Sequence, residues 1–417
     1  MPLPLKPPNR VDPLNFPVFA ISWFGNPGDG LSLVAYCGGG GSAKTGVNNA
    51  VLVRAPTGDT LRIETGEKVG VAIKIVPNPV TRIIWLFVSL GKTVERYHLP
   101  SGEKTGEIEV DGDGVNAIAV NAMCDRLACG CENGQVKVYE ISDDFFSTEG
   151  LLYTCEGHEK SVCALDFSMH GGRLVSSAKD GFARVWKEAD CIAELKCSIE
   201  GGKKPPPRSK NPQILVRGCA FGNLEGTVVY TVASARRGSA FLARWFQTPE
   251  GFECERVEVS EDPISAMNLS GDGGLLALGA VDGTIILWRT DDWKPAKTFK
   301  EVHDLPVTCI AARPYDVWLQ GEDAGITYHA ISASADSRLA HLTTQRRVPK
   351  QSKPGDESIF TVLWNWMVVL AIVLLALRPM FTDFQGRCGG VEDFVECLMN
   401  EVIIAPATHP GVMSPPY

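Results

Sequence analysis

The chain has 417 residues, of which 44% are hydrophobic and 21% charged, so it holds enough apolar material for one large folded domain with additions. Its 42 glycines and 27 prolines favour many short strands joined by tight turns. The net charge of −9 argues against generic nucleic-acid binding, which depends on a basic surface. The 13 cysteines include no Cys-x-x-Cys pair and therefore indicate buried reduced thiols rather than zinc ligands. Four of them lie in apolar, strand-like runs: Cys37, Cys163, Cys219 and Cys309.

The N-terminal residues 1–17 are rich in proline and lack the apolar core of a secretory signal. We therefore expect the part of the chain that precedes any membrane segment to lie in the cytosol.

The first predicted blade unit, 18–56, contains a glycine-rich run, CGGGGSAKTGVNNAVLV, over residues 37–53. Its centre is one residue short of a phosphate-binding P-loop. A P-loop must lead into a helix whose N-terminal amides bind phosphate, whereas this run leads into the β-type residues 51–53. We therefore reject nucleotide binding by this chain itself. Bare backbone can approach a ligand or partner, and inward carbonyls can hold a cation, so a binding role is favoured over a hairpin without function.

Three stretches share one register: 115–140, 162–187 and 264–289. Each has an apolar strand, a second strand of small residues, a tight turn and a third strand. The turns carry Asn133-Gly134, Asp180-Gly181 and Asp282-Gly283, and an aromatic residue follows six positions after each Asn or Asp. Such pairs tolerate the positive φ of a tight hairpin. Three copies in one register are a strong repeat signal.

The second of these stretches has the features of a standard WD repeat. His158, Ser176, Asp180 and Trp186 match the hydrogen-bonded chain that braces such a blade, so we interpret His158 as structural rather than as a catalytic base. His303 is expected to be the same element in degraded form.

Weaker units at 18–56, 72–100, 215–246 and 307–344 bring the count to seven, with six or eight still open. We expect an early N-terminal strand to complete the last blade, because a closed ring removes exposed strand edges. The polar segment 201–212 is expected to be a solvated insertion between two blades.

Residues 359–377 read IFTVLWNWMVVLAIVLLAL, without a charge. As a helix this run is about 28 Å long, which is enough to cross a hydrocarbon core. Basic residues are more frequent before the run than after it, which places the N-terminal side in the cytosol. In the short tail that follows, Cys388 and Cys397 could oxidise together, because a lumen permits disulfides.

The sequence thus predicts an all-β protein, a seven-bladed WD-repeat β-propeller with a C-terminal single transmembrane helix. The predicted parts are a cytosolic propeller over 1–345, a basic linker over 346–358, a transmembrane helix over 359–378 and a short lumenal tail over 379–417.

The glycine run, the divergent propeller and the C-terminal anchor together resemble the endoplasmic-reticulum membrane guanine-nucleotide exchange factors of the COPII small GTPase. This WD-repeat family includes the prolactin regulatory element-binding protein. The resemblance implies an endoplasmic-reticulum membrane location and a factor that promotes GDP release and GTP loading on the GTPase that initiates COPII coat assembly for ER-to-Golgi transport. Such a factor regulates a GTPase and is not itself an enzyme.

The resemblance also implies that the glycine loop performs exchange and binds a potassium ion. The glycines Gly38 to Gly41 match the run of the family. Because the family's loop asparagine does not align with one side chain here, the exchange role is assigned to the whole loop. Its residues are Gly38, Gly39, Gly40, Gly41, Ser42, Ala43, Lys44, Thr45, Gly46, Asn48 and Asn49. The carbonyls assigned to potassium are those of Gly40, Gly41, Ser42 and Ala43.

The expected partners are the small GTPase of the COPII coat and the endoplasmic-reticulum membrane, with no nucleic acid and no small-molecule substrate. Two alternatives stay open. One is a membrane-anchored WD-repeat scaffold without exchange activity. The other is an enzyme acting on a small substrate, for which the repeats offer only structural aspartates and histidines.

Overall fold

The computed structural model describes residues 9–26, 31–41, 46–55, 58, 60–204, 212–314 and 328–344. These residues belong to one compact unit, Met1–Arg347, whereas a second unit, Val348–Tyr417, lies outside the described residues. The predicted linker, transmembrane helix and lumenal tail also lie outside them and stay predictions. Within the described ranges, no helix is long and apolar enough to cross a membrane.

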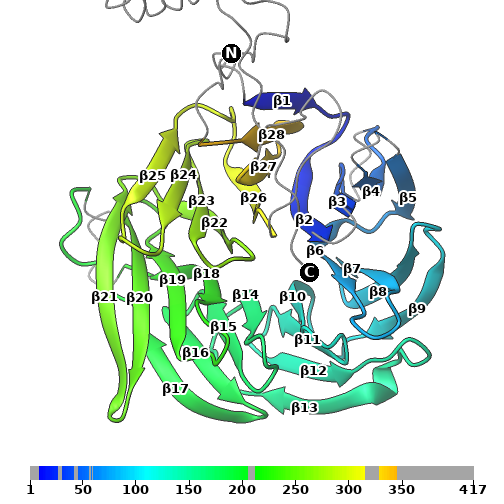
Figure 1. Cartoon of the computed structure of the whole chain (residues 1–417), viewed down its shortest axis with the longest axis horizontal. Coiled ribbons are helices and arrows are strands. Elements are labelled where there is room, and N and C mark those ends of the chain that lie inside the picture. Colours follow the sequence, from blue (N-terminus) through cyan, green and yellow to red (C-terminus); the bar gives the residue numbers. More distant parts are fainter. Residues whose placement is uncertain are drawn as a thin grey trace, which may run out of the picture. The chain divides into compact units, whose positions relative to one another are not determined.

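The described strands form seven sheets of four antiparallel strands each, arranged as blades around a centre (Figure 1). In chain order the first four blades, I to IV, follow the sequence without a crossover. Their strands are β2 (Val18–Asn26), β3 (Leu31–Gly38), β4 (Asn49–Arg54) and β5 (Thr60–Gly66); β6 (Gly70–Pro77), β7 (Ile84–Leu90), β8 (Thr93–Leu99) and β9 (Lys104–Glu109); β10 (Val115–Val120), β11 (Arg126–Cys131), β12 (Val136–Glu140) and β13 (Leu151–Cys155); and β14 (Val162–Phe167), β15 (Leu174–Ala178), β16 (Phe182–Lys187) and β17 (Asp190–Lys196). A 3₁₀ turn at Thr148–Gly150 precedes β13.

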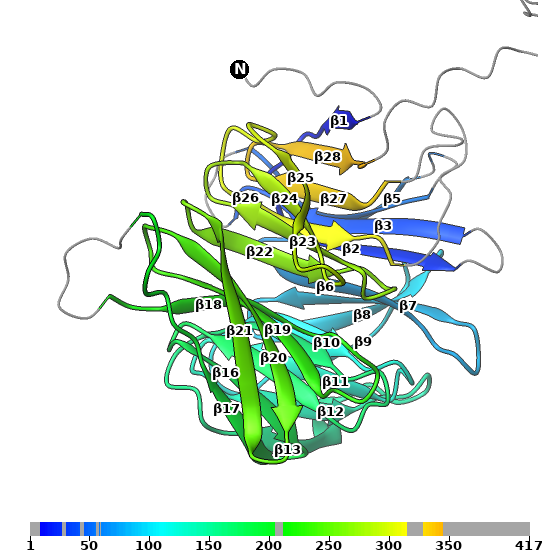
Figure 2. The ribbon, with the colours of Figure 1, turned by 60° about the vertical axis from the view of Figure 1, so that its left-hand side comes forward.

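Blades V to VII complete the ring, and the seven-bladed prediction is confirmed. Blade V includes the longest described hairpin, β20–β21, which Figure 2 shows along the side of the unit. The strands are β18 (Leu215–Phe221), β19 (Val228–Ser234), β20 (Ala240–Thr248) and β21 (Gly251–Ser260); β22 (Ile264–Leu269), β23 (Leu275–Ala280), β24 (Ile285–Arg289) and β25 (Pro295–Phe299); and β26 (Val307–Ala312), β27 (Ala330–Ser334), β28 (Arg338–Leu342) and β1 (Arg10–Pro13).

The ring closes as the sequence predicts, because β1 pairs antiparallel with β28 as the outer strand of blade VII. The carboxylate of Asp12 on β1 also reaches blade I, where Arg54 donates to it at 3.0 Å. Burial disfavours the charged form of Asp12, but the hydrogen bond and charge of His341 and the charges of Arg10 and Arg54 outweigh it and hold its pKa at about 2. One short strand therefore joins the last blade to the first.

Every first strand carries a bulge near its start, where one residue is left out of the pairing with the second strand. The residue after the bulge is small in all seven blades: Ala20, Ala72, Ala117, Ala164, Gly218, Ala266 and Cys309. The four weak units thus repeat the same local geometry as the three strong ones.

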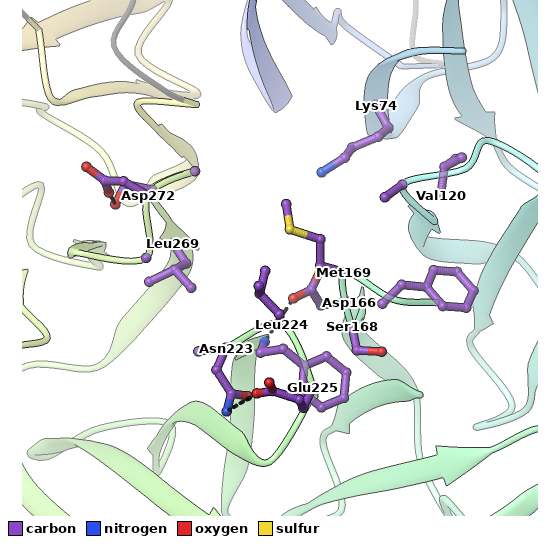
Figure 3. Close-up of a pocket in the computed structure, with 17 residues that line it drawn as sticks. Lys74, Val120, Asp166, Ser168, Met169, Asn223, Leu224, Glu225, Leu269 and Asp272 are labelled. Atoms are coloured by element: carbon purple, nitrogen blue, oxygen red, sulfur yellow. Dashed lines mark hydrogen bonds between the residues drawn. The ribbon is translucent and has the colours of Figure 1, made fainter. Parts of the chain in front are cut away.

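The seven first strands line the centre and contact one another in a closed cycle, with β26 next to β2. They share one direction, since Thr308 near the start of β26 donates to the carbonyl of Val18 at the start of β2. We call the end of this channel where the first strands begin the entry rim, and the end where they finish the exit rim. Because neighbouring strands of a blade are antiparallel, the second-to-third connections lie at the entry rim and the first-to-second turns at the exit rim. Figure 3 shows the exit-rim end, with Lys74 and Asp166 on its wall.

The described cysteines are free thiols, as the sequence predicts, but Cys191 and Cys254 are exposed rather than buried. Cys37, Cys219 and Cys309 are buried, whereas Cys163 is only partly buried, because it is the residue that the bulge of β14 leaves out of the pairing. Cys388 and Cys397 lie outside the described residues. The polar segment 201–212 is an insertion between β17 and β18. Lys203 and Lys204 of its described part contact blade V.

Candidate functional site

The glycine-rich run forms the connection between β3 and β4 of blade I, at the entry rim. Its described residues are 38–41 and 46–49, whereas Ser42, Ala43, Lys44 and Thr45 lie outside the described residues. The run joins two strands of one sheet, and Gly38 pairs with Ala50 across it. This strand-to-strand connection agrees with the rejection of a P-loop, which requires a following helix.

Two of the glycines are required by close packing. A Cβ on Gly38 would lie 1.9 Å from the carbonyl oxygen of Pro17, and one on Gly39 would lie 2.5 Å from Cα of Asn49. Gly39 also has φ of 140°, a conformation that side chains rarely adopt, and its N–H donates to Pro17 at 3.0 Å. The base of the loop is therefore closely packed between Pro17, which precedes β2, and Asn49.

Asn49 holds the loop from below and is only 2% exposed. Its amide oxygen accepts from the N–H of Gly41 at 2.9 Å, and its amide nitrogen donates to the carbonyls of Gly41 at 3.2 Å and Gly66 at 2.9 Å. A further bond runs from Gly40 N–H to the Val47 carbonyl at 3.3 Å. Because a buried amide with three bonds fixes the backbone on both sides, Asn49 makes the base of the loop a defined shape.

Asn48 differs from its neighbour, because it is exposed and its side chain forms no hydrogen bond to the described residues. Gly46 beside it is exposed with φ of 76°, and nothing lies within 4 Å of the Cβ position. The structure therefore separates the two asparagines of the predicted site into a buried brace, Asn49, and a side chain at the surface, Asn48. This division between Asn48 and Asn49 was not predicted.

The described carbonyls of Gly40 and Gly41 suit a hard cation better than a transition metal. Gly40 offers a carbonyl that accepts no hydrogen bond from the described residues, and Gly41 offers one that accepts a single bond from Asn49. Carbonyl oxygens suit hard cations. Among the described residues, no group of three or more His, Cys, Asp or Glu side chains could hold a metal ion.

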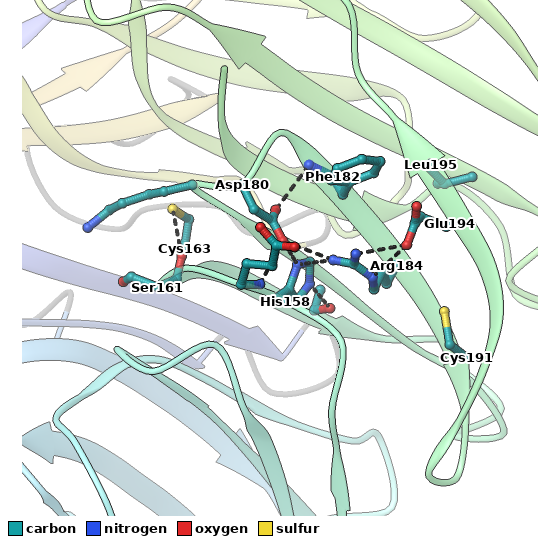
Figure 4. Close-up of polar contacts among 12 residues, drawn as sticks. His158, Ser161, Cys163, Asp180, Phe182, Arg184, Cys191, Glu194 and Leu195 are labelled. Carbon is teal, nitrogen blue, oxygen red and sulfur yellow. Dashed lines mark hydrogen bonds and ion pairs between the residues drawn. The ribbon is translucent and has the colours of Figure 1, made fainter. Parts of the chain in front are cut away.

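A second polar cluster, in blade IV, has the composition of a hydrolytic triad (Figure 4). His158 lies 2.9 Å from Asp180 through Nδ1 and 2.7 Å from Ser176 Oγ through Nε2. The indole N–H of Trp186 donates to the same Ser176 oxygen at 2.8 Å. Ser176 is completely buried, so no substrate reaches its oxygen, and a nucleophilic role is excluded. The cluster braces the blade, as predicted.

The charges of this cluster stabilise one another. Burial disfavours ionised Asp180, but the hydrogen bond and charge of His158 and the bond from Arg184 outweigh it and hold the pKa of Asp180 at about 2. Blade VII repeats the arrangement, with His303 at 3.0 Å from Asp336 and 2.9 Å from Ser332. Leu342 stands ten residues after Ser332, where blade IV has its tryptophan. The prediction of a degraded second copy is confirmed.

The hydrogen bonds that the carbonyls of Pro17 and Gly66 accept from Gly39 and Asn49 were not predicted. Pro17 and Gly66 both lie outside the run, and they reach it only because β2 and β5 belong to the same blade. A glycine run of this kind signals close backbone contact, but not which backbone makes it.

Comparison with protein families agrees with the fold. A family model described as WD domain, G-beta repeat matches residues 253–289, and one described as WDR54 matches residues 99–200. The propeller therefore contains a WD repeat.

Curated proteins from plants and animals resemble the chain at low identity. It is 27% identical over 243 residues to SEC12-like protein 2 of Arabidopsis thaliana, covering 57% of this chain and 53% of that protein. It is 24% identical over 270 residues to the guanine nucleotide-exchange factor SEC12 of Mus musculus, covering 62% and 60%. It is 25% identical over 202 residues to the angio-associated migratory cell protein of Homo sapiens, covering 48% and 40%. The chain thus spans about half the length of these relatives.

Proposed function

We propose that this chain is a guanine-nucleotide exchange factor for a small GTPase, with the β3–β4 glycine loop as its exchange element. The observation that carries the proposal is the loop itself. A glycine run lies at the entry rim on a buried asparagine brace, in a propeller similar to two relatives named for SEC12.

Exchange requires no acid, base or nucleophile from the factor. A factor accelerates release by binding the nucleotide-free GTPase more tightly than the loaded one. A thousandfold acceleration corresponds to about 4 kcal/mol of barrier reduction. The loop suits this task because its base is fixed by Asn49 while Asn48 and Gly46 are exposed. An element ordered before binding pays less entropy when it enters a partner.

The partner in this proposal is the small GTPase that initiates COPII coat assembly, and the site of action is the endoplasmic-reticulum membrane. The apolar run at 359–377 supports a membrane anchor. An anchored factor would load its GTPase at the bilayer where the coat assembles.

A potassium ion is proposed at the carbonyls of Gly40, Gly41, Ser42 and Ala43. When bound, it would supply a positive charge that orders these carbonyls. The unengaged Gly40 carbonyl supports this donor set, whereas Asn49 orders the base of the loop without any ion.

The test measures release of a fluorescent GDP analogue from the COPII-initiating GTPase, with the purified full chain in mild detergent. We expect acceleration in potassium buffer and a smaller effect in sodium buffer. Gly172→Ala is the matched control for loop glycine variants, because its added Cβ meets nothing within 4 Å. If the intact chain left the release rate unchanged in both buffers, exchange activity would be rejected.

A scaffold without exchange activity is the second candidate. The chain is similar, at an identity close to that of the SEC12 relatives, to the angio-associated migratory cell protein, whose name does not include exchange, and this similarity favours the second candidate. A scaffold would bind the GTPase equally well with and without nucleotide and would leave the release rate unchanged.

A further inference from the structure

The exit rim of the channel holds a cavity of about 510 Å³, within the ~300–1,000 Å³ range of ligand pockets. It is lined by Lys74 of β6 and by the first-to-second turns of blades III to VI. The glycine loop belongs to the entry rim, so this cavity is separate from the proposed exchange site. Because five blades contribute to its wall, it exists only in the closed ring.

Two opposite charges face this cavity. Asp166 on β14 accepts the N–H of Phe221 at 2.9 Å through one carboxylate oxygen, and its carboxylate also accepts the backbone N–H of Phe167. The ammonium of Lys74, which extends from β6 into the same space, makes no hydrogen bond within the described part of the chain (Figure 3). Burial raises the pKa of Asp166 to about 6, although the hydrogen bond from the Phe221 N–H and the charge of Lys74 lower it. The carboxylate is therefore poorly solvated. Both groups retain capacity for a ligand.

Exposed apolar side chains surround the opening. Three successive exit-rim turns each carry one: Met123 is 55% exposed, Met169 45% and Leu224 51%. Met169 and Leu224 line the cavity together with Leu269 (Figure 3). Single exposed apolar residues are ordinary, but several of them on successive turns beside a cavity indicate a binding surface.

The charge of the lining selects the kind of ligand. The cavity lining contains three acidic residues, Asp166, Glu225 and Asp272, and one lysine. Of the three acidic residues, only Asp272 forms a salt bridge within the described part of the chain, with Arg313 at 3.2 Å. A cationic ligand with apolar neighbours complements this wall.

We propose that the exit rim binds an extended peptide segment of a partner protein in which cationic and apolar side chains alternate. A cationic side chain of the peptide pairs with Asp166 and Glu225, and its neighbours pack on Met169 and Leu224. The Lys74 ammonium donates to a carbonyl of the peptide. The surface is independent of nucleotide exchange.

The test is fluorescence anisotropy of a labelled octapeptide of alternating leucine and arginine, titrated with the purified full chain in mild detergent, with protein-free micelles as the blank. A leucine–glutamate octapeptide is the matched probe. We expect saturable binding of the arginine peptide, at least tenfold tighter than that of the glutamate peptide. Asp166→Asn keeps an acceptor for Phe221 and should weaken binding at least fivefold, as should Leu224→Ser.

Leu305→Ser is the matched control, because Leu305 is 45% exposed but lies before β26 at the entry rim. It should bind the arginine peptide within twofold of the parent chain, and urea denaturation midpoints should show that all three variants are folded. Equal affinity for the two peptides, no saturable binding, or equal affinity of parent, Asp166→Asn and Leu224→Ser would each overturn the proposal.

Discussion

Blade I and blade IV use the same four-stranded sheet for different purposes, and the contrast lies in one connection. In blade IV the second and third strands meet at Asp180-Gly181, and the aspartate is bound into a buried network with His158 and Arg184. In blade I the same connection is the glycine loop, whose base is fixed by the buried Asn49 and by backbone hydrogen bonds to Pro17 and Val47. In a repeat architecture, one blade can have a binding loop in place of the buried polar network, because each blade is stabilised by its neighbours.

The largest effect is expected from a substitution in the buried polar network of blade IV. His158→Ala leaves Asp180 and Ser176 buried without their common partner, and breaking a buried charge pair costs about 3–5 kcal/mol. Arg184 still bonds Asp180, so we expect a loss of about 3 kcal/mol, at the low end of that range. Urea denaturation of the full chain measures this loss. A loss below about 1 kcal/mol would contradict a bracing role.

The converse change removes the shape of the glycine loop. Gly39→Ala places a Cβ within 2.5 Å of Asn49 Cα, so the base of the loop must move. We expect GDP release to slow about a hundredfold, which corresponds to about 2.7 kcal/mol. The release assay checks this, with Gly172→Ala expected to match the parent chain. If Gly39→Ala exchanged at the parent rate, the loop would have no part in exchange.

Acid should remove the stabilisation that the ionised Asp180 gives to blade IV. The pKa of Asp180 is held near 2 in the folded chain, below its ordinary value of 3.8, so its stabilisation is present above pH 3.8 and is lost as the pH falls towards 2. The difference corresponds to about 2 kcal/mol, and Asp180→Asn should remove that part of the pH dependence. Denaturation midpoints at pH 2.5 and pH 5 measure it. The pH dependence of stability that arises from Asp12, whose pKa is also about 2, should remain in the Asp180→Asn variant.

The two asparagines of the glycine loop provide the finest comparison. Asn48→Ala should slow GDP release about tenfold, or about 1.4 kcal/mol, without changing stability, because Asn48 is exposed. Asn49→Ala should slow release and also lower the free energy of unfolding by about 1–2 kcal/mol, because it leaves Gly41 and Gly66 groups unpaired. Identical behaviour of the two variants in both measurements would remove the distinction between brace and surface residue.

The sequence predicted the parts of the fold that repeat. The seven blades, the closing N-terminal strand and the blade IV network follow from turn pairs and alternating strands at a regular spacing. Apart from β1, the fourth, outer strands were not predicted. β5 and β9 are largely exposed and polar, so they carry little of the apolar signal by which strands are recognised.

The sites were less predictable than the fold, because their contacts join residues distant in the sequence. The glycine run identified the loop, but the burial of Asn49 depends on Gly66, 17 residues away. The exit-rim cavity had no local signal at all. Asp166 is a single acidic residue in an apolar strand, and its meeting with Lys74 becomes visible only when the ring is closed. Contacts across blades need the topology before they can be inferred.

The closure of blade VII by β1 has a consequence for synthesis on the ribosome. Residues 10–13 are translated first, but their partner strand, 338–342, emerges about 325 residues later. At 5–20 residues per second, the N-terminal segment waits roughly 15 to 65 seconds for its partner. During that time the ring is an open arc with two unpaired ends, and a chaperone that shields nascent edges would act in this interval.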